Sequence, residues 1–307
     1  MLHPVRTLAT IVCKLDNTIL YRRIPDAFYL KSLFTLMGQK LNLKQPQYWT
    51  HKIQWIKLFD RNPLYTKCAD KYAVREYISQ TIGDTYLIPL LGVFKTFDEI
   101  DFSMLPEQFV LKCNHDSGSV IICKDKNSFD KEQARLKLQK ALSINYCNDY
   151  PHREWVYKNI PPCIVAEKYV SPSSGEELRD YKFFCFNGEP KCLYVSEIGM
   201  HEPKVTFYDL DWNEMPVSTG YEKLDHTAEK PNCFDEMLFV CRNVSKKMCF
   251  VRVDLYEVDG KIYFGELTFY PHAGYYPFSP EWNKIFGDWL KLPTDKKVVN
   301  VGKKNST

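Results

Sequence analysis

Four side chains in the last quarter of this 307-residue chain have types and spacings that could do chemistry. In FVRVDLY, Arg252 and Asp254 occupy alternate positions of an expected strand, and in YFGELTF Glu266 and Thr268 do the same. Alternate side chains of a strand share a face. Mg²⁺ takes hard oxygen ligands, usually one or two carboxylates with water and phosphate oxygens. Asp254 and Glu266 are therefore candidate Mg²⁺ ligands, and ion-paired residues on an exposed sheet face are the alternative.

The connection between these two strands decides whether the carboxylates meet. Asp259-Gly260 favours a two-residue turn, which would set Asp254 opposite Gly265 and send Glu266 to the other face. We predict instead an odd-length or bulged loop, because that connection brings Asp254 within about 5 Å of Glu266 on one surface.

Two further segments could serve a nucleotide. Lys112 lies late on an expected strand, and Ser117, Gly118 and Ser119 follow at the turn. Such a loop can fold its amides over phosphates while the lysine supplies a point charge, although an ordinary hairpin turn has the same composition. The segment 164–170, IVAEKYV, leaves the core as a strand that could offer backbone groups to an adenine, and an ordinary strand end explains it equally.

The remaining elements must position these residues. Residues 1–70 are expected to form helices, and the aromatic segment 48–65 could stack on sugar rings or pack in the core. The spacing predicts a helix from the N-cap Asp70 to Gly83 and a hairpin turned at Asn187-Gly188. Strands in antiparallel pairs, separated by helices, indicate an α+β fold.

Composition narrows the class of protein. The chain is 45% hydrophobic, enough for two or three packed subdomains, and its net charge of +3 is spread along the chain, which argues against nucleic acid as a partner. Its 11 cysteines are odd in number and include no CxxC pair, which predicts reduced thiols and a cytoplasmic location. No segment approaches the roughly 18 apolar residues of a membrane-spanning helix. Nothing in the sequence indicates an oligomeric state.

The order of the motifs resembles a known family. Lysine strand, small-residue loop, helix, acidic strand, hairpin, helix, then R-x-D and E-x-T is the order of an ATP-grasp domain. DKYAVREYI, FVLKCNHDSGS, AEKYV, DYKFFCFNGEP, FYDLDW and the segment 251–271 resemble the TupA-like ATP-grasp family, named after a teichuronopeptide biosynthesis protein. The resemblance covers about residues 60–290 and implies an ATP-grasp fold, in which two α+β subdomains grip ATP.

With this resemblance the chain divides into five expected parts. A helical N-terminal region at 1–70 and a segment at 71–105 precede the grasp. A first subdomain at 106–170 carries the phosphate loop and hinge, a second at 171–292 carries the metal site, and 293–307 is a flexible tail.

The resemblance also implies roles for single residues. Lys112 and Lys182 would contact phosphates under the Ser117–Ser119 loop, and Asp180 or Glu177 would reach the ribose. Asp254 and Glu266 would hold Mg²⁺, with Thr268 where the family usually has asparagine. Arg252 would face the anionic intermediate, as in D-alanine–D-alanine ligases. The residues expected to line the adenine are Glu167, Lys168, Tyr169 and Val170.

The implied reaction joins a carboxylate to an amine through an acyl phosphate, with ATP and Mg²⁺. His115 and His272 could take the amine's proton, or could be structural. The family's association with capsule, O-antigen and cell-wall polymers implies a uronic-acid carboxylate, nucleotide- or polymer-linked, or an acidic peptide, and a small amine such as an amino acid or amino alcohol. It also implies peripheral association with membrane-bound polysaccharide machinery.

Two other functions remain open at this point. A glycosyltransferase would use a D-x-D motif and a nucleotide sugar, and DLD at 209–211 is the candidate. A catalytically inert nucleotide-binding module is the other, favoured by Thr268 but not by the intact Lys112, Arg252 and carboxylates.

Overall fold

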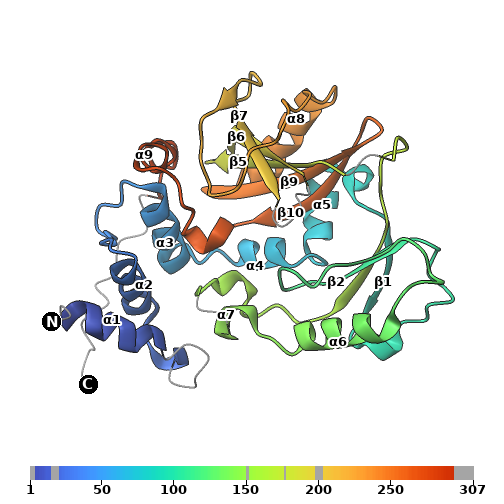
Figure 1. Ribbon diagram of the computed structural model, residues 1–307, viewed down its shortest axis with the longest axis horizontal. Helices are drawn as coiled ribbons and strands as arrows, with labels where there is room; N and C mark the ends of the chain where they lie inside the picture. Colours follow the sequence, from blue (N-terminus) through green and yellow to red (C-terminus); the bar gives the residue numbers. More distant parts are fainter. Residues whose placement is uncertain (1–3, 15–20, 150–151, 176–177, 198–202, 294–307) are drawn as a thin grey trace.

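The computed structural model describes residues 4–14, 21–149, 152–175, 178–197 and 203–293. Figure 1 shows two sheets with the helices α4 and α5 between them, and α1 to α3 with α9 to one side. The helices are α1 (Pro4–Lys14), α2 (Asp26–Leu36), α3 (Trp49–Phe59), α4 (Pro63–Ala69), α5 (Val74–Ile82), α6 (Lys131–Leu142), α7 (Tyr146–Asp149), α8 (Phe234–Ser245) and α9 (Pro280–Trp289). The strands are β1 (Leu90–Phe94), β2 (Phe109–Cys113), β3 (Ile121–Cys123), β4 (Ile164–Lys168), β5 (Asp180–Phe186), β6 (Glu189–Glu197), β7 (Lys204–Tyr208), β8 (Glu214–Met215), β9 (Phe250–Val258) and β10 (Lys261–Thr268).

The aromatic segment of the N-terminal region forms α3 and is packed in the core. Trp49 and Ile53 are fully buried and Trp55 nearly so. α9 packs beside α3, where the Asn283 side chain accepts a hydrogen bond from the Thr50 amide at 3.0 Å. Core packing, and not sugar stacking, is therefore the use of these aromatic side chains.

α4 and α5 connect this region to the first sheet. Asn62 caps α4 through the Leu64 amide, and Gly83, with a φ of 96°, ends α5 as predicted. The predicted start of α5 was early, because α5 begins at Val74. The Asp70 carboxylate instead accepts from the amides of Tyr72 and Ala73, in the turn before the helix.

The smaller sheet has four antiparallel strands in the order β1-β4-β2-β3. Phe109, Leu111 and Cys113 of β2 belong to a core that includes side chains of α6, so the alternate residues Val110 and Lys112 point to the opposite face. β1 lies within residues 71–105 and pairs with β4 in this same sheet. The division of the chain into five parts stays a prediction.

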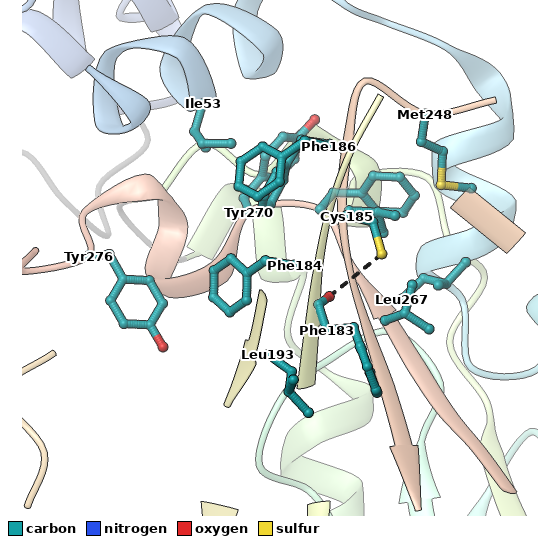
Figure 2. Packing of buried hydrophobic residues seen from close by; sticks show 14 of the residues in the cluster. Ile53, Phe183, Phe184, Cys185, Phe186, Leu193, Met248, Leu267, Tyr270 and Tyr276 are labelled. Carbon is teal, nitrogen blue, oxygen red and sulfur yellow. Dashed lines mark hydrogen bonds between the residues drawn. The ribbon is translucent and has the colours of Figure 1, made fainter. Parts of the chain in front are cut away.

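The larger sheet has six antiparallel strands in the order β10-β9-β5-β6-β7-β8. The β5–β6 hairpin turns at Asn187-Gly188, with φ values of 52° and 86°, as predicted. Figure 2 shows Phe184 of β5 beside Tyr276, and Phe186 of β5 near Ile53 of α3. One hydrophobic core therefore joins the six-stranded sheet to the N-terminal helices.

Three remaining expectations concern the cysteines, membrane-spanning segments and the C-terminal tail. The ten cysteines whose side chains the structure describes are all free thiols. No helix within the described ranges is long and apolar enough to cross a bilayer. The expected flexible tail lies outside the described residues, apart from Pro293.

Candidate active site

The β9–β10 hairpin brings the predicted metal ligands together by a route that the sequence did not reveal. Asp259-Gly260 forms a tight two-residue turn, with Val258 opposite Lys261, so the predicted odd-length or bulged loop between the strands is wrong. The register shifts further along, between Phe264 and Glu266, so that a bulge sets Glu266 opposite Asp254. The predicted meeting of the two carboxylates on one face is confirmed.

Gly265 makes this bulge possible. A Cβ at this position would lie 3.0 Å from the Asp254 carbonyl oxygen and 3.0 Å from the Tyr256 ring. The same shift sets Thr268 opposite Arg252. All four residues of the opening pattern therefore lie side by side.

Arg252 organises this face. Its Nε and one terminal nitrogen bind the two oxygens of Asp254 at 2.7 and 2.6 Å. The latter nitrogen also reaches Glu266 at 3.3 Å and the Thr268 hydroxyl at 3.1 Å. Asp254 is only 1% exposed, and a charge so deeply buried needs such pairing. The nearby carboxylates raise the pKa of Arg252 although burial opposes them.

Asp180 and Lys182 of β5 extend the same face. Lys182 Nζ binds Asp254 Oδ2 at 2.8 Å and also Asp180 Oδ2. Burial raises the pKa of Asp180 to about 6, with Asp254 adding to the effect and Lys182 opposing it. Asp180 thus lies with the metal and phosphate candidates, and the alternative ribose candidate Glu177 lies outside the described residues.

The pKa of Glu266 is shifted in the opposite direction to that of Asp180. Burial acts to raise its pKa, but the charges of Lys71, Arg252 and Lys182 and the Thr268 hydroxyl lower it to about 2. Thr268 Oγ1 donates to Glu266 Oε1 at 2.8 Å. Glu266 therefore remains ionised at any physiological pH.

Lys71 was missed by the sequence reasoning. Its Nζ donates to the Asp116 carbonyl oxygen, at the start of the small-residue loop, and its charge acts on Glu266. Asn114 holds the two segments together, because its side-chain Nδ2 donates to Asp70 Oδ1 at 2.9 Å and its backbone carbonyl oxygen accepts from the Lys71 amide. The DKYAVREYI motif contained the signal, but a lysine beside a helix start has no distinctive spacing.

The small-residue loop is partly open and partly fixed. Ser117 and Gly118 are exposed, and Gly118 has a φ of 100°. Ser119 is buried, donates to Asp116 Oδ1 at 2.7 Å and accepts from the Cys113 amide at 2.8 Å. Ser119 therefore braces the loop while Ser117 and Gly118 face outward.

The predicted adenine strand carries an ion cluster. Glu167 of β4 forms ion pairs with Lys112 Nζ at 2.6 Å and with Arg75 of α5 at 3.2 Å. Lys168 is exposed, Tyr169 and Val170 are half-buried, and the Lys168 amide donates to the Pro89 carbonyl. Lys112 and Glu167 thus share a face, on the side of the sheet away from α6.

His115 is placed away from the proposed chemistry. The residue is 1% exposed, and its two ring nitrogens lie 3.3 Å from the Asn114 side-chain oxygen and 3.1 Å from the Ile144 carbonyl oxygen. Both nitrogens are engaged in structural hydrogen bonds, so this placement gives the ring no route to an attacking amine. The other histidine, His272, does line the cavity described next.

A cavity of about 490 Å³ joins the elements described so far. One end is lined by Lys71, Asp116 and Ser117, and β9 and β10 contribute Arg252, Glu266 and Thr268. The lining continues over two 3₁₀ turns, η4 (Trp155–Tyr157) and η5 (Pro271–Gly274), with residues next to them. The lining residues of that second end are Tyr146, His152, Glu154, Tyr157, Tyr270, Pro271, His272, Ala273 and Tyr275.

The oxygen atoms of this face are of the kind that Mg²⁺ takes, with both oxygens of Asp254 bound by Arg252 in this structure. Asp254, Glu266 and Thr268 offer hard oxygen atoms, and Glu266 is held ionised. No group of three or more His, Cys, Asp or Glu side chains suited to a metal occurs within the described ranges. Mg²⁺ does not require one, because phosphate oxygens and water complete its coordination.

In the D-x-D candidate at 209–211, the first carboxylate is bound by groups of its own turn. Asp209 follows β7, and its carboxylate accepts from the amides of Asp211 and Asn213 and from the Asn213 side chain, at 2.8 to 3.0 Å. It borders the β7–β8 pair, at the edge of the larger sheet opposite β10. This geometry does not favour a glycosyltransferase.

The two sheets, with a cavity lined by lysine, arginine and carboxylate side chains, have the ATP-grasp fold. The model of the TupA-like ATP-grasp family matches residues 51–291. The chain therefore belongs to the TupA-like ATP-grasp family.

Solved structures show distant likenesses only. An ATP complex of D-alanine–D-alanine ligase from Bacillus anthracis is 16% identical, with a TM-score of 0.39 over 71% of this chain and 56% of the ligase. L-amino acid ligase from Bacillus licheniformis is 14% identical, with a TM-score of 0.41 over 73% of this chain and 49% of that ligase. The D-cycloserine synthetase DcsG is 15% identical, with a TM-score of 0.41 over 74% of this chain and 71% of the synthetase. The chain thus spans about half the length of the first two, and no curated protein matches it.

Proposed function

We propose that this protein is an ATP-dependent ligase that joins the carboxylate of a uronic-acid sugar to a small amine during surface polysaccharide synthesis. The single observation that carries the ligase part is the cavity, where Lys71 and Ser117 face Arg252, Glu266 and Thr268. The polysaccharide part rests on the resemblance to a family named after a teichuronopeptide protein. We further propose that the enzyme works beside membrane-bound polysaccharide machinery.

The residues divide the work of holding ATP. Lys71, Lys112 and Lys182 would bind phosphates, with the loop at 117–119 over them, because amides and lysine charges favour a polyanion. The segment 167–170 would line the adenine. Asp254 and Glu266 would hold Mg²⁺, with the Thr268 hydroxyl as a further oxygen.

The reaction then proceeds in two transfers. A carboxylate oxygen attacks the γ-phosphorus, ADP leaves, and an acyl phosphate forms. The amine attacks the carbonyl carbon, loses a proton, and expels phosphate to leave the amide. Arg252 is placed to stabilise the oxyanion between attack and expulsion. Bound Mg²⁺ supplies neutralisation of phosphate charge.

ADP release from Mg²⁺·ATP tests this function. Free glucuronate, galacturonate and their UDP derivatives would be crossed with amino acids and amino alcohols, with Glu266→Gln as the inactive control. The proposal expects ADP only when acid and amine are both present. Release of UDP from a sugar donor, without ADP, would contradict it and favour sugar transfer.

A further inference from the structure

The second end of the cavity holds a buried carboxylate that the proposed nucleotide and metal roles leave unused. Glu154 lines the cavity beside η4 and is only 6% exposed. Within the described part of the chain, its carboxylate has no hydrogen-bond or ion-pair partner, whereas a buried carboxylate normally has both.

The charge of Lys57 does not neutralise Glu154 by contact. Lys57 of α3 is fully buried and donates its hydrogen bonds to the carbonyl oxygens of His152 and Ala273, both at 2.8 Å. Its charge acts on Glu154 through space, without an ion pair within 4.0 Å in the described structure. Lys57 fixes the cavity wall, and the carboxylate is left for a ligand.

Backbone strain at this wall supports a built site. His272 and Ala273 have φ values of 48° and 51°, in the left-handed region that costs non-glycine residues free energy. Lys57 and Gln54 both hold the Ala273 carbonyl oxygen, at 2.8 and 3.0 Å. Buried side chains of α3 thus keep this wall in its strained form next to Glu154.

The charge around Glu154 favours a ligand with an ammonium group and no carboxylate of its own. The lining residues of the second end are tyrosines, histidines and small residues around this one carboxylate. Lys57 lies behind them, over the rings of Tyr270 and Tyr275, and donates its hydrogen bonds to the backbone. Partial desolvation, with the charge of Arg252, lowers the pKa of His272, so this ring is neutral near neutral pH. Tyr157 lies close enough to both Glu154 and Glu266 to be affected by their charges, so the two ends are contiguous.

We infer that Glu154 binds the ammonium group of the amine substrate, and that this substrate is an amino alcohol or a related amine without a carboxylate. The inference rests on the proposed function and names the substrate class of its second step. The carboxylate substrate lies by Arg252, and the amine approaches it from Glu154.

The experiment separates the two halves of the reaction by choice of nucleophile. Hydroxylamine is neutral near neutral pH and traps an acyl phosphate as a hydroxamate, so it needs no ammonium site. Ethanolamine is an ammonium ion and does. Wild type, Glu154→Gln and Glu154→Asp would be assayed with each nucleophile and with the acid that gives most hydroxamate.

We expect Glu154→Gln to keep its hydroxamate rate and its KM for ATP. Its KM for ethanolamine should rise roughly 10- to 100-fold, the effect of removing a charged hydrogen-bond partner. Glu154→Asp should recover part of that loss. Asp60→Asn is the matched control, because Asp60 is a buried carboxylate bound to Tyr65 and does not line the cavity.

Matched amines test the substrate class. Wild type should prefer ethanolamine to serine and alaninol to alanine, since each pair differs by one carboxylate. An unchanged ethanolamine KM in Glu154→Gln, equal loss with hydroxylamine, or preference for serine and alanine would overturn the inference. Absence of hydroxamate from wild type with every acid would instead refute the proposed function.

Discussion

Two ion clusters flank the proposed ATP site, and they carry opposite balances of charge. The Glu167 cluster holds two cations, Arg75 and Lys112, around one carboxylate. The Arg252 cluster holds two cations, Arg252 and Lys182, among the three carboxylates Asp180, Asp254 and Glu266. An excess of positive charge suits phosphate, whereas an excess of negative charge suits a divalent cation.

The comparison teaches that charge count, more than residue type, separates the roles. Lysines and carboxylates occur in both clusters, so neither is diagnostic alone. A substitution in one cluster leaves the other cluster as an internal reference.

Removing Arg252 should have the largest effect. Arg252→Met takes away the proposed oxyanion donor, and loss of one such donor costs about 10²–10³ in rate. It also leaves Asp254 with Lys182 alone, so the melting temperature should fall. The hydroxamate assay measures the first effect and thermal unfolding the second.

Arg252→Lys distinguishes charge from geometry in that result. Lysine keeps the charge but cannot bind both oxygens of Asp254 in a fork. Near-normal stability with a low rate would support the catalytic role. A normal rate in Arg252→Met would remove Arg252 from the mechanism.

Gly265→Ala should disturb the Arg252 cluster through the backbone. The added methyl group meets the Asp254 carbonyl and the Tyr256 ring at 3.0 Å, and overpacking of this kind costs about 1–3 kcal/mol. Since the bulge sets the register of Glu266, the Mg²⁺ concentration for half-maximal activity should rise. Gly260→Ala is the control, because its strained turn lies at the far end of the hairpin; an equal Mg²⁺ effect there would contradict the role of the bulge.

Lys112→Met should weaken the Glu167 cluster by a smaller amount. A phosphate-contacting lysine contributes a charged hydrogen bond, so the KM for ATP should rise about tenfold. The Mg²⁺ requirement should stay unchanged, because the other cluster is intact. Lys131→Met, on the exposed side of α6, should alter neither value; an unchanged KM for ATP in Lys112→Met would show that Lys112 only pairs with Glu167.

The sequence predicted the pieces of the site better than their connections. Turn residues predicted the β5–β6 hairpin, and alternation predicted the shared face of Arg252 with Asp254 and of Glu266 with Thr268. The bulge at Gly265 could not be predicted, because the Asp259-Gly260 turn alone favours the wrong register and the correction lies several residues away.

Residues from distant segments were the harder case. Lys71 and Glu154 enter the cavity because tertiary packing brings α4, η4 and β10 together, and neither residue has a local pattern. The predicted proton-accepting role of His115 is not supported, for the converse reason. Its neighbours along the chain are motif residues, but the Ile144 carbonyl, 29 positions away, binds its ring.

The smallest expected effect compares two carboxylates of the Arg252 cluster by pH. Glu266 has a pKa lowered to about 2, so its stabilising contribution is complete above the unfolded value of about 4.3 and is lost as pH falls towards 2. Asp180 has a pKa raised to about 6, so its ionisation penalises folding increasingly as pH rises from about 4 to 6.

Denaturant unfolding of two variants, between about pH 2 and 6, measures these opposite effects of the two carboxylates on the free energy of unfolding. The stability of Glu266→Gln should approach that of wild type as the solution becomes more acidic. The free energy of unfolding of Asp180→Asn should rise relative to that of wild type, by an amount of the order of 1 kcal/mol, as pH rises through the interval in which buried Asp180 ionises. Parallel curves for the two variants would mean that the surrounding charges act alike on both carboxylates, which would contradict the opposite pKa shifts of Glu266 and Asp180.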